Sequence, residues 1–157
     1  MDPLFGIVGS IVFAALFAFA AASKIADLQR FRLVLRAYGL VPKSLIAPFA
    51  VLLVAVEVTV AAIWLSFAFV QAAAALTVGL LALYTFAMVT NLVRGRRYID
   101  CGCGRNERPL SWALVARNVV YAAFAGWLVV PVGGRDLGGW DIAVIVAAVL
   151  VVVVLDR

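Results

Sequence analysis

The residues best suited to chemistry are Cys101 and Cys103, the only two cysteines in this chain of 157 residues. One glycine separates them, in the segment Asp100-Cys101-Gly102-Cys103-Gly104. Extended residues advance about 3.3 Å each, so a disulfide between the two cysteines needs a bent backbone, which the glycines allow. We expect a disulfide closed across one residue to be strained, and strained disulfides exchange more readily than structural ones. The spacing therefore favours thiol–disulfide redox chemistry.

Other interpretations of the cysteine pair are metal binding and simple burial as small apolar side chains. A zinc site normally has four ligands, and the chain contains no histidine that could complete one. Two thiolates do suit Cu(I). Arg97 and Arg105 are close enough in sequence to stabilise a thiolate, which is the attacking form. We predict Cys101 and Cys103 as the catalytic pair and assign no metal ligands.

The composition is that of an integral membrane protein. Hydrophobic residues make up 67% of the chain and charged residues 13%, against roughly 45–50% and 25% in soluble domains. The net charge of +5 arises from basic residues beside apolar segments, which is typical of membrane topology and does not indicate nucleic-acid binding.

Five apolar stretches approach the roughly 20 residues that a membrane-spanning helix needs. They predict an all-α, polytopic membrane helix bundle in a single domain over residues 1–157. Four spans form its core, and a fifth short span lies at the C-terminus. The expected spans are 4–23, 46–69, 72–92, 112–130 and 142–155. The cysteines fall in the loop 93–111, between the third and fourth spans.

A further helix is expected at the membrane interface, over residues 25–38. Apolar residues recur there at helical spacing, with Asp27, Arg30, Arg32 and Arg36 between them. Pro42 then marks the turn back towards the membrane, because proline disfavours helical geometry in the preceding residue.

The distribution of basic residues predicts the topology of the chain. With five spans, eleven arginines and lysines share one face of the membrane, and Arg135 alone lies on the other. The positive-inside rule then places the cysteine loop on the cytoplasmic face of a bacterial-type inner membrane, with the N-terminus outside. Cytosolic thiols are normally kept reduced, so a pair on this face would be transient, catalytic or metal-binding.

Several polar residues fall inside the predicted spans. Glu57 lies near the bilayer centre, where a mid-helix charge costs roughly 2.5–3.5 kcal/mol, so we expect it to be protonated or paired. Arg117 is the expected partner, and Lys24, Asn91 and Asn118 lie towards the same face. These residues either form an ion pair that fixes helix register or line a polar pocket for a thiol partner, a quinone or a proton.

Together, these motifs resemble the MauE/DoxX family of redox-associated membrane proteins. The similarity covers roughly residues 13 to 125, and the order and spacing of the motifs carry it. Many relatives have Cys-Gly-Cys-Phe-Gly, whereas Gly104 is followed here by Arg105. The matching pieces are Ser23-Lys24, Tyr38-Gly39-Leu40-Val41-Pro42, Glu57, Arg94-Gly95, Cys101-Gly102-Cys103-Gly104, Ser111-Trp112 and Arg117-Asn118.

The resemblance implies a four-helix core and a role in thiol–disulfide chemistry. MauE is associated with maturation of the disulfide-rich small subunit of methylamine dehydrogenase, beside a thioredoxin-like partner, and DoxX-like relatives are linked to quinone-coupled sulfur oxidation. We therefore expect a membrane thiol–disulfide oxidoreductase component, without a covalent cofactor, that exchanges electrons with a thioredoxin-like protein or a quinone. The alternatives are a Cu(I)-handling or small-solute transport protein and a structural subunit of a homo- or hetero-oligomeric membrane complex.

Overall fold

Three long apolar helices dominate the part of the chain that the computed structural model describes, which is residues 3–96, 98, 109–129 and 146–147. They are α1 (Pro3–Ala26), α3 (Ile46–Leu65) and α4 (Val70–Val93). Their apolar segments have mean hydropathies of 2.1, 2.4 and 2.0, and each is long enough to cross a membrane. The all-α membrane bundle expected from the sequence is thereby confirmed.

The remaining helices in the described residues are α2 (Leu28–Tyr38) and α5 (Trp112–Trp127). The amphipathic α2 begins at Asp27, whose side chain accepts a hydrogen bond from the backbone of Arg30 at 2.8 Å. It ends at Gly39, whose φ of 64° is the left-handed conformation that glycine adopts without strain. The helix predicted at the membrane interface therefore has a start signal at Asp27 and a stop signal at Gly39.

Two short connections lead into and out of α3. The chain passes from Pro42 through a 3-10 turn, Lys43–Leu45, into α3. Pro48 is accommodated in the first helical turn, where an amide hydrogen would have no partner within the helix. At the other end, α3 stops at Leu65, four residues before the end of the predicted span. Phe67 has a φ of 53° there, and the chain reverses directly into α4.

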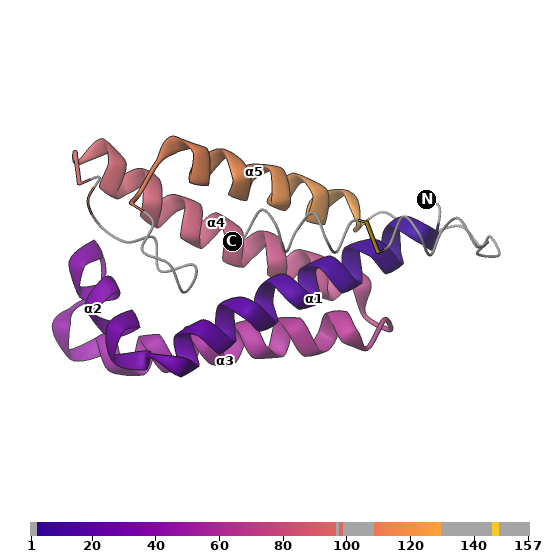
Figure 1. The fold of residues 1–157 in the computed structure, drawn as a ribbon, viewed down its shortest axis with the longest axis horizontal. Coiled ribbons are helices and arrows are strands. Elements are labelled where there is room, and N and C mark those ends of the chain that lie inside the picture. The colour runs from indigo at the N-terminus through magenta and orange to yellow at the C-terminus, as the bar shows by residue number, and fades with distance from the viewer. Residues whose placement is uncertain (1–2, 97, 99–108, 130–145, 148–157) are drawn as a thin grey trace.

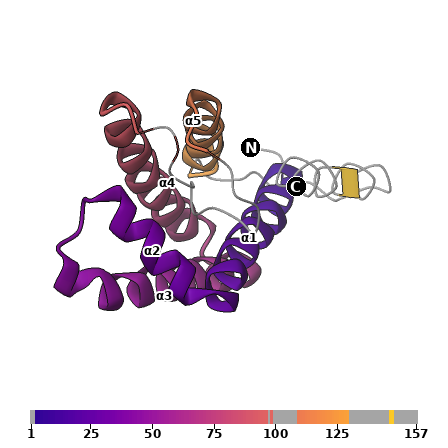
Figure 2. The same cartoon turned by 60° about the vertical axis from the view of Figure 1, so that its left-hand side comes forward.

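The long helices run alternately up and down and pack as two antiparallel pairs, α1 with α3 and α4 with α5 (Figure 1). Figure 2 shows α4 and α5 together on one side and α1 and α3 together on the other. The α2 helix, the end of α4 and the start of α5 all lie at one end of the bundle. The turn between α3 and α4 lies at the opposite end.

An aromatic core fills the half of the bundle near the α3–α4 turn. Phe13 stacks between Trp64, at 5.3 Å between ring centroids, and Phe124, at 5.8 Å. The indole nitrogen of the fully buried Trp64 donates a hydrogen bond to the Thr77 hydroxyl at 2.9 Å. These contacts join α1, α3, α4 and α5 in this half of the bundle.

The predicted fifth span, 142–155, and most of the loop 93–111 lie outside the described residues. Of that span, residues 146 and 147 are described and are helical. The predicted fourth span, 112–130, coincides with α5, which begins at Trp112 and ends at Trp127; its 16 residues make it shorter than the three candidate membrane spans.

Candidate functional site: a buried ion pair between two helices

A buried ion pair links α1 to α3. The Nζ atom of Lys24 lies 2.6 Å from Oε1 of Glu57, and the two side chains are only 5% and 0% exposed. Lys24 lies in the last turn of α1, and Glu57 lies in the middle of α3. The attraction between opposite charges at this distance offsets part of the cost of burying them, and neither charge is left alone in the apolar interior.

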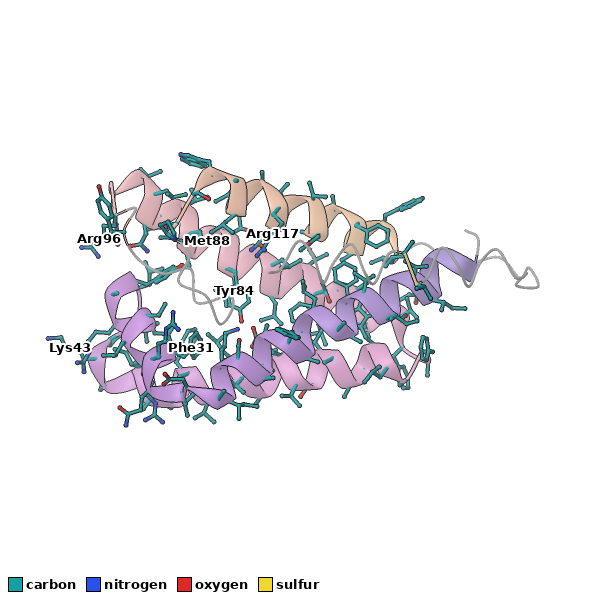
Figure 3. The ribbon with its side chains drawn as sticks, viewed as in Figure 1. Phe31, Lys43, Tyr84, Met88, Arg96 and Arg117 are labelled. Carbon is teal, nitrogen blue, oxygen red and sulfur yellow. The ribbon has the colours of Figure 1, made fainter. Side chains whose placement is uncertain are left out.

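Two aromatic side chains complete the surroundings of this pair. The Tyr84 hydroxyl, from α4, donates a hydrogen bond to Oε1 of Glu57 at 2.6 Å. The Lys24 ammonium also lies 5.3 Å from the centre of the Phe31 ring and 5.6 Å from that of Tyr84. Figure 3 shows Phe31 and Tyr84 on opposite sides of the interior, from α2 and α4. Side chains from four helices thus surround this ion pair.

The expected pairing of Glu57 with Arg117 is not the one in the structure. The α1 helix packs along α3, so Lys24 lies next to the carboxylate of Glu57. Arg117 belongs to α5, which packs on α4 instead. The half-buried Arg117 guanidinium lies 5.9 Å from the centre of the Tyr121 ring instead. The position of Glu57 within its span correctly predicted a buried polar region, but it did not identify the residue that pairs with the carboxylate.

The second carboxylate oxygen of Glu57 is different from the first. Oε1 accepts hydrogen bonds from both Lys24 and Tyr84, whereas Oε2 is buried and has no hydrogen-bond partner among the described residues. A buried carboxylate oxygen can accept hydrogen bonds, and leaving it unpaired costs free energy. Oε2 of Glu57 can therefore accept a hydrogen bond from a donor that is not among the described residues.

The two asparagines predicted at this end are both buried. Asn91 donates through its side-chain nitrogen to the carbonyl of Ala87 at 3.1 Å, while its side-chain oxygen has no partner among the described residues. Asn118 lies on α5 and is 4% exposed. Within the described part of the chain, no hydrogen bond joins either amide to Lys24 or Glu57, so the structure brings together only part of the predicted set.

The sequence reasoning missed Tyr84 and Phe31. A tyrosine in the middle of an apolar span was the available signal, because a buried phenol usually finds a hydrogen-bond partner. Phe31 was visible only as one member of the apolar stripe of α2, and its position over an ammonium group depends on how α2 folds back against α1.

Cys101 and Cys103 lie outside the described residues, but the ends of their loop are described. The amide of Arg96 donates to the carbonyl of Asn91 at 3.0 Å, just beyond the end of α4. At the other end, Leu110 is buried and Ser111 caps α5 by accepting from the backbone of Leu114. The loop is thus anchored at the α2 end of the bundle. Within the ranges described, no cluster of three cysteine, aspartate or glutamate side chains could hold a metal ion.

Sequence comparison identifies the family. A family model described as methylamine utilisation protein MauE matches residues 2–131 of the chain. The chain belongs to the MauE family. The family resemblance noted from the motifs is therefore confirmed over most of the chain's length.

Curated MauE relatives support the same assignment. The methylamine utilisation protein MauE of Paracoccus denitrificans is 38% identical over 117 residues, which is 73% of this chain and 63% of the relative. That of Paracoccus versutus is 38% identical over 71% of this chain and 61% of the relative. The Methylorubrum extorquens protein is 37% identical over 85% and 73%, respectively. This chain thus spans a little over three fifths of the Paracoccus relatives. No solved structure was found to match.

Proposed function

We propose that this MauE-family chain is a membrane thiol–disulfide redox protein that supports maturation of a partner protein. Cys101 and Cys103 cycle between dithiol and disulfide. One thiolate attacks a disulfide of the partner to form a mixed disulfide, and the second attacks that bond and releases the partner's dithiol. The reverse steps oxidise the partner. Each full exchange moves two electrons and two protons; a reduced thioredoxin-like protein supplies them when the partner is reduced, and a quinone or an oxidised thioredoxin-like protein accepts them when the partner is oxidised.

One observation carries this proposal: the buried polar cluster lies in the same half of the bundle that anchors the cysteine loop. Tyr84 is nine residues before the end of α4, a rise of about 13 Å in a helix. Lys24 is two residues from the end of α1. A hydrogen-bonded cluster in this half of the bundle holds together the helices from whose ends the loop extends. Its unpaired Glu57 oxygen also offers a place for a proton or a donor ligand.

The proposed topology places the loop end at the cytoplasmic face of an inner membrane. Among the described residues, and apart from the buried Lys24–Glu57 pair, this end carries six basic side chains and one carboxylate, that of Asp27, whereas the turn 66–69 at the opposite end has no charged residue. This asymmetry follows the positive-inside rule. The six basic residues are Arg30, Arg32, Arg36, Lys43, Arg94 and Arg96.

The names of the curated relatives suggest methylamine utilisation as the context. We propose that the partner belongs to that process and that its disulfides are the substrate of Cys101 and Cys103. The test is complementation of a methylamine-using host that lacks its own MauE, with the full chain carrying Cys101→Ser, Cys103→Ser or both. The membrane level of each variant is measured beside growth on methylamine.

We expect both single variants and the double variant to abolish growth on methylamine while remaining in the membrane. We also expect one single variant to accumulate a mixed disulfide that a reductant releases on a non-reducing gel. Full growth of the double variant would refute the redox role and favour a structural subunit. Loss of growth without any change in thiol redox state, together with Cu(I) bound by the reduced pair, would favour the metal-handling alternative.

A further inference from the structure

A basic surface without a carboxylate partner among the described residues lies along one side of α2. Arg32 and Arg36 are four residues apart and therefore on one side of the helix, and Gly39 follows on that side three residues later. In the described residues, the two carboxylates are those of Asp27 and Glu57. Asp27 caps α2, and Glu57 pairs with Lys24. No described carboxylate is therefore left for these arginines.

A third guanidinium joins this surface from α4. A side-chain carbon at Gly39 would lie 3.3 Å from Nη1 of Arg96, so Arg96 packs directly against the C-terminal cap of α2. Figure 3 shows Arg96 beyond the end of α4 on the same side as α2. Glycine at position 39 is required by its left-handed backbone and also leaves room for this approach. We call Arg32, Arg36 and Arg96 the arginine cluster.

Arg32 has an unsatisfied donor in this cluster. Its Nε atom is buried and has no hydrogen-bond partner in the described structure. Guanidinium groups present planar sets of donors that match phosphate oxygens, and such charge-assisted bonds are stronger than neutral ones. Three guanidinium groups with no described carboxylate partner are suited to a phosphate.

Apolar side chains near the cluster indicate the source of that phosphate. Leu33 on α2, Leu40 just after it and Val93 at the end of α4 are all exposed at this end of the bundle. An amphipathic helix at the interface places such side chains among acyl chains and its basic groups at the depth of the headgroups. A molecule that has both a phosphate and acyl chains can contact the arginine cluster and the exposed apolar side chains at the same time.

We propose that the arginine cluster binds the headgroup phosphate of an anionic phospholipid and thereby fixes α2 against the end of α4. The site requires neither Cys101 nor Cys103, so it stands independently of the proposed redox function. It recognises phosphate by paired guanidinium groups and lipid by the neighbouring exposed leucines and valine.

The experiment uses the full chain purified in detergent. Native mass spectrometry counts bound lipid, and the unfolding temperature is measured with added phosphatidylglycerol, phosphatidylcholine, inorganic phosphate or glycerol 3-phosphate. The test variant is Arg32→Gln with Arg36→Gln, and Arg96→Gln is examined separately. The matched control is Lys43→Gln with Arg94→Gln, which removes the same charge from exposed residues at the same end. Circular dichroism verifies that each variant keeps its helix content.

We expect phosphatidylglycerol to raise the unfolding temperature more than phosphatidylcholine in the wild-type chain and in the control. The test variant should bind phosphatidylglycerol roughly tenfold or more weakly, as expected for lost charge-assisted hydrogen bonds. Arg96→Gln, which removes one guanidinium, should show a smaller loss in the same direction. Equal effects of the two lipids, or an equal loss in the control, would overturn the proposal. Full stabilisation by inorganic phosphate or glycerol 3-phosphate would show that free phosphate is the ligand and would also overturn it.

Discussion

Lys24 and Glu57, 33 residues apart in the sequence, form a 2.6 Å ion pair that is almost completely shielded from solvent. The pair joins the last turn of α1 to the middle of α3. Its position explains how a charged residue is accommodated in an otherwise apolar span, because each charge is the other's principal compensation.

Breaking this pair from either side should strongly destabilise the bundle. Lys24→Met or Glu57→Met should each lower the free energy of unfolding by about 3–5 kcal/mol, because a buried charge is left without its counter-charge. The double variant should lose less than the sum of the two, because no lone charge remains. Unfolding by SDS in mixed micelles measures this cycle. Simple additivity would contradict a direct interaction, and Lys43→Met is the exposed-lysine control.

The Tyr84 hydroxyl should contribute to stability through its hydrogen bond to Glu57. Tyr84→Phe keeps the ring beside Lys24 and removes only the donor, so we expect a loss of about 1.5–3 kcal/mol, the range for hydrogen bonds to charged groups. Tyr98→Phe is the matched control, since Tyr98 is 99% exposed. If the two variants unfold alike, the Tyr84 hydrogen bond has no energetic weight.

The hydrogen bond from Trp64 to Thr77 should stabilise the opposite half of the bundle. Thr77→Val replaces the hydroxyl by a methyl group of similar size and leaves the buried indole N–H unpaired, at a cost of about 1–3 kcal/mol. Unfolding by SDS in mixed micelles measures the loss. Thr59→Val should have little effect, because Thr59 is exposed and bonds only to its own helix, at the carbonyl of Ala55. An equal loss in both would show a general effect of valine.

Two glycines in long helices should respond oppositely to alanine. At Gly9 an added side-chain carbon would overlap the buried Leu128 side chain, so Gly9→Ala should cost about 1–3 kcal/mol through overpacking. At Gly79, in α4, nothing lies within 4 Å, so Gly79→Ala should be neutral or stabilise by up to about 1 kcal/mol. Thermal unfolding of both variants tests the prediction, which fails if Gly9→Ala is the more stable of the two.

The sequence was sufficient to predict where the helices lie along the chain, but not which helices pack against one another. Apolar length predicted α1, α3 and α4, and it also predicted the start of α5 at Trp112. The end of α3 was placed too late, because Ser66 to Phe69 continue the apolar composition through a turn, and hydropathy cannot distinguish a turn from a helix there.

The same holds for the buried polar residues: the sequence indicated that they are present but not how they pair. The depth of Glu57 in its span could be read from the sequence, and so could the need for a partner. Which cation reaches it depends on helix neighbours and rotations, which set Lys24 against Glu57 and place Arg117 on the other helix pair. Tyr84 and Phe31 became recognisable only once α2 and α4 were placed around the same carboxylate.

The reversal between α3 and α4 has a consequence for membrane insertion. From Ile46 to Val93 the chain contains one charged residue, Glu57, and the reversal itself, residues 66–69, is uncharged. Two helices joined by so short an uncharged connection can enter the bilayer together as a hairpin, with no ionised loop to carry across. Biogenesis would then deliver Glu57 into lipid ahead of any contact with α5, leaving Lys24, already synthesised upstream, as the first cation it meets.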